Sequence, residues 1–286
     1  MHEFLAGSSP LLVDSDNDGV ADSIEVANGT SPSISNIIKE ITVDTDLSQS
    51  ADFTSLNDAI ASIRGILRQP HVIRTRSSSG IADTDPVRIS SIFSNRFADL
   101  KIILEDSYVL DITATKGYFH AIDLMSEYVT LKGEGGKIII RNNGHVATYG
   151  LMSFRQAKDS LVIIENLSLE GQMDASQPSY GLKAKNAANK HVIRNNVVTG
   201  FVGSGSYGIF AYYENYFYNN TVSNNQIGFR WKEPSGEIYN TISVLNNGSD
   251  YHAWMPWSGI TNSNNISSDT TANISGDRSR VVEFIG

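Results

Sequence analysis

A run of twelve residues near the N-terminus has the composition and spacing of a metal-binding loop. Oxygen ligands occupy its positions 1, 3, 5, 7, 9 and 12, with a backbone carbonyl at position 7, and the residues are Asp14, Asp16, Asp18, Val20, Asp22 and Glu25. Gly19 at position 6 allows the sharp turn of an EF-hand loop, and the long acid at position 12 closes the shell of hard oxygens around Ca²⁺. An arbitrary acidic turn, the alternative, seldom satisfies every position at once. Calcium is therefore the predicted cofactor.

The residues after this loop indicate which kind of calcium site to expect. The stretch Val26-Ala-Asn-Gly29-Thr30-Ser-Pro32 resembles the tail of the thrombospondin type 3-like calcium repeats of bacterial surface proteins, in which a short helix and a Gly-Thr-x-Pro stop follow the loop. The resemblance covers a single repeat. It implies a structural ion that stiffens residues 1–36, because a calcium sensor would need a second loop and a target groove.

Five copies of an asparagine pattern organise the second half of the chain. They read Glu165-Asn166-Leu167, Asn195-Asn196-Val197, Asn220-Thr221-Val222, Asn240-Thr241-Ile242 and Asn264-Asn265-Ile266, at intervals of 30, 25, 20 and 24 residues by subtraction. Such periods indicate a solenoid, and the short β-rich runs around them favour a parallel β-helix. We expect the asparagines to form corners, where Asn tolerates the left-handed conformation and can bond to the next coil. We expect one buried apolar column made of Leu167, Val197, Val222, Ile242 and Ile266.

A helix and several short strands are predicted before these repeats. Thr54 or Ser55 can cap a helix over about residues 54–68, whose apolar positions recur every three or four residues at Leu56, Ala59, Ile60, Ile63, Ile66 and Leu67. This helix would cover the open end of the solenoid, and a partner-binding helix is the alternative. β-Rich runs begin at Leu100. The predicted fold is an all-β, right-handed parallel β-helix with a calcium-binding segment (1–36), a cap region (37–99) and the β-helix (100–286).

Several stretches resemble one broad family. Arg194-Asn-Asn-Val-Val-Thr-Gly200, Tyr216-Phe-Tyr-Asn-Asn220-Thr-Val and Asn265-Ile-Ser-Ser-Asp269 are similar to right-handed β-helix (pectin-lyase-like) proteins of environmental bacteria and phages. The resemblance covers about residues 100–285 and extends weakly to Asp52-Phe-Thr-Ser-Leu-Asn-Asp, which is similar to the N-terminal cap helix of that family. It implies the fold. It implies no single activity, because this scaffold serves both enzymes and inert fibres.

The catalytic signatures of the family's enzymes are missing from the repeats. Pectate lyases hold calcium with a carboxylate cluster and polygalacturonases use neighbouring aspartates, whereas the nearest fragments here are Asn143-Gly144-His145 and Arg230-Trp231-Lys232-Glu233. A glycosidase needs two carboxylates about 5 to 10 Å apart. Adjacent coils could supply such a pair from Glu165, Glu170 or Asp174 with Glu214, Glu233 or Glu237. Catalysis is the less favoured hypothesis, and no catalytic residue is predicted.

Two aromatic clusters could take part in recognition. One runs from Tyr207 to Tyr218 and the other from Tyr251 to Trp257. Alternation along a strand must place some of these rings in the core, and the others could contact a sugar or another protein. The segment Trp254–Trp257 is the better candidate for a protein interface, because it lies in a predicted insertion between two coils.

The composition argues against several classes of partner. A net charge of -9 disfavours nucleic acid and anionic membrane surfaces. The chain has no cysteine, which excludes disulfides and thiolate chemistry. The first residues lack a basic signal region, and we expect no membrane span because every apolar run is too short.

These features together predict a non-catalytic structural protein stabilised by calcium. We expect it on a cell surface, on a virion surface or otherwise outside the cell, assembled with copies of itself or with a shell or fibre protein. The alternative hypothesis is a β-helix protein that binds or degrades a polysaccharide.

Overall fold

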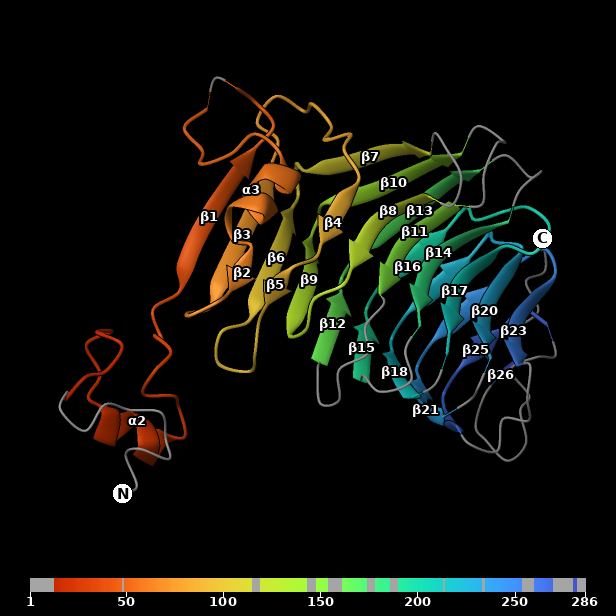
Figure 1. Ribbon diagram of the computed structural model, residues 1–286. Coiled ribbons are helices and arrows are strands. Elements are labelled where there is room, and N and C mark those ends of the chain that lie inside the picture. The colour runs from red at the N-terminus through yellow and green to blue at the C-terminus, as the bar shows by residue number, and fades with distance from the viewer. Residues whose placement is uncertain are drawn as a thin grey trace.

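The computed structural model describes residues 13–47, 49–114, 119–142, 148–153, 161–173, 178–185, 190–212, 214–232, 235–253, 260–269 and 280–281. Within these residues the protein is an all-β chain of stacked parallel strands (Figure 1), and the predicted parallel β-helix fold is confirmed. Two short helices, α2 (Asp22–Asn28) and α3 (Leu56–Ser62), lie in the N-terminal part.

Three long parallel sheets form the walls of the solenoid. Sheet 1 contains β1 (Lys39–Asp44), β3 (His71–Arg76), β6 (Leu100–Glu105), β9 (Val129–Glu134), β12 (Leu161–Glu165), β15 (Lys190–Arg194), β18 (Glu214–Tyr218), β21 (Ser235–Tyr239) and β24 (Ile260–Ser263). Sheet 2 contains β7 (Val109–Ala114), β10 (Lys137–Asn142), β13 (Ser168–Met173), β16 (Val197–Thr199), β19 (Thr221–Ser223), β22 (Ile242–Val244), β25 (Ile266–Ser267) and β26 (Arg280–Val281). Sheet 3 contains β4 (Val87–Ile89), β8 (Phe119–Leu124), β11 (Thr148–Ser153), β14 (Ser179–Ala184), β17 (Tyr207–Ala211), β20 (Ile227–Trp231) and β23 (Ser249–Ala253). A separate short pair joins β2 (Gly65–Ile66) to β5 (Ile92–Phe93).

From β6 onward the chain visits the sheets in the order 1, 2, 3 and then returns to sheet 1 one coil further along. Each strand therefore pairs with the equivalent strands of the coils before and after it, and the coils stack from the N-terminal end to the C-terminal end of Figure 1. The stacking begins before residue 100, where the sequence had suggested a boundary, because β1 pairs with β3 and β3 pairs with β6.

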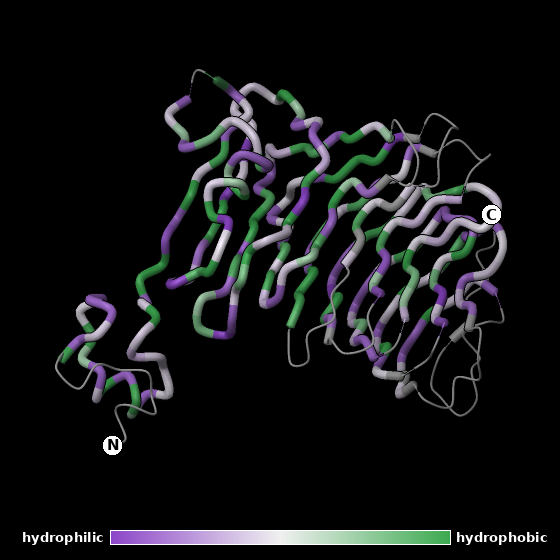
Figure 2. Tube along the Cα trace, in the orientation of Figure 1, coloured by the Kyte–Doolittle hydropathy of each residue, from purple (hydrophilic) through white to green (hydrophobic). Residues whose placement is uncertain are grey.

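Residues in register on the inner faces form continuous apolar columns. One column crosses sheet 1 from its first strand to its eighth and consists of Ile41, Ile73, Ile102, Leu131, Ile164, Ile193, Phe217 and Ile238. All eight side chains are buried. Burial of each is worth about 1.5 to 3 kcal/mol. Hydrophobic and hydrophilic residues alternate along the strands in Figure 2, as the two-residue period of a strand requires.

The apolar column predicted from the asparagine pattern is wrong. Strand pairing places Val197, Ile242 and Ile266 in one column with Ser168 and Thr221, so Leu167 and Val222 are each one residue out of register with it. Val197 is 44% exposed, and this column faces outward. A slip of one residue moves a side chain to the other face of a strand, which explains the error.

The left-handed asparagines define the correct frame of the repeat. Asn166, Asn195, Asn219, Asn240 and Asn264 all have φ between 51° and 57°, and each lies at the corner between sheet 1 and sheet 2. The first copy thus begins at Asn166 and not at Glu165, and the third begins at Asn219 and not at Asn220. The prediction that the asparagines are corner residues is confirmed, since Asn219 donates to Asn195 and Asn240 donates to Asn219 through their side-chain amides.

The residue after each corner asparagine is buried, and it is often a second asparagine. The carboxamide of Asn220 accepts from the backbone N–H of Asn196 and donates to the carbonyl of Ile193 in the preceding coil. Asn196 and Asn265 bond to their preceding coils in the same way. A buried amide whose bonds are all satisfied holds two coils in one register, because any shift would leave it unpaired.

Helix α3 begins at the predicted place but ends earlier than expected. Ser55 is the cap, and its hydroxyl accepts from the backbone N–H of Asp58. The helix ends at Ser62, whereas the sequence suggested about residue 68, because Gly65 has φ of 111° and starts strand β2. Ile66, predicted to belong to the apolar face, is 75% exposed. Leu56, Ala59 and Ile60 are buried against the first coils, which agrees with a capping role.

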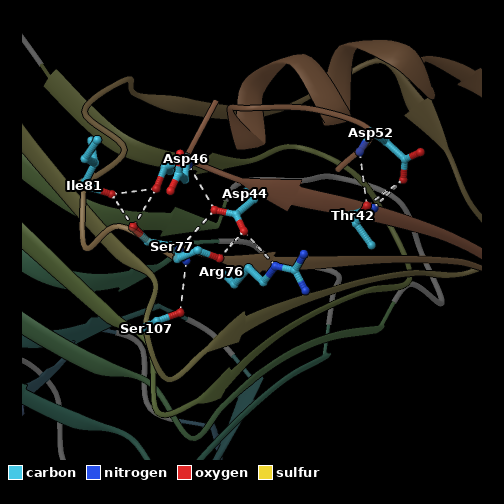
Figure 3. A network of polar contacts seen from close by, with 10 residues as sticks. Thr42, Asp44, Asp46, Asp52, Arg76, Ser77, Ile81 and Ser107 are labelled. Carbon is cyan, nitrogen blue, oxygen red and sulfur yellow. Dashed lines mark hydrogen bonds and ion pairs between the residues drawn. The ribbon is translucent and has the colours of Figure 1, made fainter. Parts of the chain in front are cut away.

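A buried carboxylate fixes the end of the first strand. Asp44 accepts hydrogen bonds from the backbone and hydroxyl of Ser78, from the backbone of Asp46 and from the Arg76 guanidinium (Figure 3). Burial alone would raise the pKa of Asp44, but these donors outweigh it and hold the pKa well below its usual range. Asp44 is thus ionised at neutral pH and ties β1 to the loop that follows β3.

Candidate functional site

The three aspartates at the start of the acidic loop converge. Carboxylate oxygens of Asp14, Asp16 and Asp18 all lie within 4.8 Å of one another, so one ion could bind all three. The loop holds itself in this shape, because the backbone N–H groups of Asp18 and Gly19 donate to Asp14 and that of Val20 donates to Asp18. Asn17 and Gly19 supply the positive φ angles, 58° and 89°, that the tight turn needs.

Two of the acids contain buried oxygens without any hydrogen-bond partner. These are both carboxylate oxygens of Asp16 and the Oε2 atom of Glu25. Glu25 lies on α2 and is fully buried. Leaving a carboxylate oxygen buried and unpaired is costly, and a divalent cation coordinated by these oxygens would remove the cost. The residues present therefore fit a calcium ion.

The electrostatics of the loop point the same way. Burial raises the pKa of Asp16, and the neighbouring carboxylates of Asp18 and Asp14 raise it further. Burial also raises the pKa of Glu25, again with contributions from Asp16 and Asp18. A hard cation bound between these carboxylates would remove their mutual repulsion, and this would favour its binding.

The remaining predicted ligands occupy different positions. Asp22 begins α2, and its carboxylate accepts from the backbone N–H of Ser15 at 2.7 Å and from the Ser15 hydroxyl at 2.6 Å. Position 9 of such loops often reaches the ion through a water, and this contact leaves that role open. Val20 lies in the loop as predicted. Asp22 and Glu25 are outside the group of carboxylates within 4.8 Å of one another.

Sequence reasoning missed one residue of this site. Asn36 donates from its backbone N–H to Asp18 at 2.7 Å and from its side-chain amide to Glu25 at 3.0 Å. It lies 11 residues beyond Glu25, outside the twelve-residue pattern. No spacing rule for such loops includes this position, so the sequence contains no signal for it.

The interior contains a serine, a histidine and an asparagine in a hydrogen-bonded chain. Ser153 Oγ lies 2.8 Å from His191 Nε2, and His191 Nδ1 lies 2.7 Å from Asn215 Oδ1. The amide of Asn215 donates to the Tyr212 carbonyl, so its oxygen faces the imidazole and Nδ1 bears the proton. The connectivity is that of a nucleophile, a base and an orienting group. All three residues are buried, however, and no substrate can reach the serine.

A second cluster lies on the outward side of sheet 3. The rings of Tyr180, Tyr207 and Phe210 have centroids 5.1 to 5.6 Å apart. Cationic side chains lie over these rings. The Lys183 amine is 4.8 Å from the ring centroid of Tyr180, and the Arg230 guanidinium is 4.8 Å from that of Tyr207. Two further amines, those of Lys232 and Lys185, lie 5.1 Å and 5.8 Å from the ring centroid of Tyr212. We refer to these eight residues as the cation–aromatic cluster.

The aromatic residues of β18 alternate between the two faces of sheet 1, as predicted. Phe217 is buried in the core, and Tyr216 and Tyr218 lie on the opposite face.

The cation–aromatic cluster creates a local positive potential on an acidic protein. Burial lowers the pKa of Lys183 to about 8, with further contributions from Lys185 and Lys232. Burial also lowers the pKa of His252, and Arg230 adds to that shift. The neighbouring cations are the smaller cause of both shifts, and burial, the larger cause, disfavours a charge of either sign.

The carboxylates considered for a glycosidase are engaged elsewhere. Glu165 pairs with Arg194 at 2.6 Å, and Glu214 and Glu237 accept from the hydroxyls of Tyr216 and Tyr218. Glu170 lies on sheet 2, whereas these three lie on sheet 1. Asp174, Glu233, Asn143-Gly144-His145 and the segment 254–257 lie outside the described residues. Glu214 and Glu237 lie on the adjacent strands β18 and β21, and both interact electrostatically with Tyr216.

Comparison of the chain with protein-family models, curated proteins and solved structures gave no match. Neither helix in the described ranges has the length and apolar character needed to cross a membrane. The functional argument therefore rests on the geometry of the acidic loop and of the cation–aromatic cluster.

The buried histidine predicts an acid-sensitive stability. Burial lowers the pKa of His191 to about 4, whereas an unfolded histidine has a pKa of 6.5. Between these values the unfolded chain binds a proton that the folded protein does not, so the free energy of unfolding should fall as the pH drops from about 6.5 to 4, by an amount on the order of 3 kcal/mol. Denaturant unfolding of wild type and His191→Gln across this range measures the effect.

The His191→Gln variant should lose less stability over that range, because glutamine does not titrate. His252→Gln serves as the comparison and should change the pH dependence of stability much less than His191→Gln, since His252 is exposed whereas His191 is fully buried. If the free energy of unfolding fell equally steeply with pH in wild type and in His191→Gln, this account of the buried imidazole would be contradicted.

Proposed function

We propose that this protein is a non-catalytic structural β-helix, stabilised by calcium, that functions on a cell surface, on a virion surface or elsewhere outside the cell. The observation that carries the proposal is the set of buried, unpartnered oxygens on Asp16 and Glu25, next to the converging Asp14 and Asp18. The resemblances of the loop to thrombospondin type 3-like repeats and of the coils to right-handed pectin-lyase-like proteins support the same assignment.

In this proposal the residues of the acidic loop would supply the oxygen donors for calcium. Asp14, Asp16, Asp18 and Glu25 would hold the ion through carboxylates, Val20 through its carbonyl and Asp22 through a water. When bound, the ion neutralises repelling acids. The chain itself holds those acids in place. The turn at Gly19 shapes the loop, and Glu25 is a buried residue of α2.

Exposed apolar side chains near this loop support an assembly role. Ile24, Val26, Ile37 and Ile38 are each between 50% and 59% exposed. A contact with another protein would remove these apolar side chains from water. We therefore propose self-association, or a contact with a shell or fibre protein, through the N-terminal segment.

Removal of calcium should loosen only the N-terminal segment. Titration calorimetry should show one calcium site in wild type, and the double variant Asp16→Asn, Glu25→Gln should weaken binding at least a hundredfold, about 3 kcal/mol, because two of the charged ligands are lost. Asp85→Asn, an exposed acid on another loop, is the control and should bind like wild type.

In a chelator, wild type should become sensitive to protease within residues 13–36 while the β-helix keeps its melting temperature. An absence of calcium binding by wild type, or equal binding by the double variant, would contradict the proposal.

A second candidate function is the binding of an acidic polysaccharide at the cation–aromatic cluster. Lys183 lies in β14 and Lys185 just after it, and Arg230 lies in β20 and Lys232 just after it. The two strands are two positions apart in sheet 3, which separates the two pairs of cations by about 10 Å along the solenoid. That separation is comparable with the length of a disaccharide unit. Tyr212 lies between Lys185 and Lys232, where its ring could stack on a sugar while the amines bind the acidic groups.

A glycan array should then show binding to uronic acid polymers and none to neutral glucans. Lys185→Gln with Lys232→Gln should weaken binding about tenfold or more, corresponding to about 1.4 kcal/mol, and the affinity should fall with added salt. Lys137→Gln, on sheet 2, is the matched control. Equal binding by the double variant and wild type would exclude this face, and release of reducing ends would indicate a depolymerase.

A further inference from the structure

Three consecutive residues join the acidic loop to the first coils of the β-helix. Ile34 packs against the hydrophobic core, and the backbone N–H of Ser35 donates to the carbonyl of Arg68 at 3.1 Å. The next residue, Asn36, points back and bonds to the loop. One short segment thus contacts both the body of the protein and the predicted calcium site.

The two acceptors of Asn36 are both predicted calcium ligands. Its backbone N–H binds Oδ2 of Asp18, and its amide binds Oε1 of Glu25. Oδ1 of Asp18 is held by the backbone of Val20, and Oε2 of Glu25 is buried without a partner. Asn36 therefore fixes one oxygen of Glu25 and leaves the other available to an ion.

These contacts make the position of Asn36 depend on the state of the loop. Asp14, Asp16 and Asp18 lie close together and repel one another and Glu25 in the absence of a cation. An ion that holds Asp18 and Glu25 in place also holds the two acceptors to which Asn36 bonds. Loss of the ion lets these acids separate and removes the contacts that orient the loop on the first coil.

We propose that Asn36 is a positioning residue that couples calcium binding to the docking of the N-terminal segment, residues 13–36, on the β-helix. The proposal rests on the calcium site proposed above. Occupation of the loop fixes Asn36, and Asn36, through Ser35 and Ile34, fixes the orientation of the loop and α2 relative to the first coils. The exposed apolar residues Ile24 and Val26 on α2 would then be presented in one orientation only with calcium bound.

The absence of cysteine allows a direct distance measurement. Ser23→Cys on α2 and Ser62→Cys at the end of α3 are exposed positions for a donor and an acceptor dye. The distribution of single-molecule energy-transfer efficiency between the two dyes should be narrow with calcium and broad with chelator. Asn36→Ala should still bind calcium, about fivefold more weakly because one hydrogen bond is lost. Its efficiency distribution should stay broad with calcium present.

Two further variants separate coupling from simple loss of structure. Asn36→Asp keeps the backbone N–H but opposes Glu25 with a like charge, and it should also stay broad with calcium. Asn28→Ala, an exposed asparagine of α2, should behave like wild type. Far-UV circular dichroism establishes that each variant keeps the β-helix.

Each remaining outcome has one meaning. A wild type that does not bind calcium overturns the proposed function and this inference with it. A wild type that binds calcium, together with a narrow distribution for Asn36→Ala, overturns the inference alone. Two further results also overturn the inference. One is a wild-type efficiency distribution that is narrow both with and without calcium. The other is an Asn36→Ala variant that differs from wild type equally in both conditions, because Asn36 would then be only structural.

Discussion

The register between successive coils is the constraint on which the rest of the structure depends. Each strand of a parallel β-helix must present the same face inward as its neighbours, and a slip of one residue would expose the whole apolar column of sheet 1. The left-handed asparagines at the corner and the buried carboxamides of Asn196, Asn220 and Asn265 prevent that slip, because a buried amide has its partners in only one register. The outward columns are fixed at the same time, and among them is the cation–aromatic cluster.

Charge is separated along the molecule, and this separation gives the two candidate sites their character. The acidic loop gathers three carboxylates near the N-terminal end, with the buried Glu25 on α2, whereas sheet 3 gathers two lysines at the end of β14 and an arginine and a lysine at the end of β20. A cation stabilises the first site and an anion the second. The solenoid allows both, since each coil contacts only its neighbours and distant surfaces can differ in chemistry without disturbing the shared core.

The sequence was sufficient to predict the fold and to locate the three aspartates that converge in the acidic loop, but not details that depend on neighbouring coils. The period of the asparagines indicated the solenoid, and the helix cap was narrowed to Thr54 or Ser55, of which Ser55 is the cap. The register at Leu167 and Val222 was not recognisable, because only the left-handed backbone at Asn166 and Asn219 shows that the first and third copies begin at those residues. The contacts of Lys183 and Asn36 were equally hidden, since their partners are brought near by folding and not by a fixed spacing.

The central claim is that calcium orders the N-terminal segment of a β-helix that folds without it. Hydrogen–deuterium exchange in calcium and in chelator tests this claim most directly, because it reports every segment in one experiment. The account predicts that calcium slows exchange in residues 13–36 and leaves exchange in the strands of sheets 1, 2 and 3 unchanged. Equal exchange of residues 13–36 in both conditions would contradict it, as would a β-helix that loses its protection in chelator.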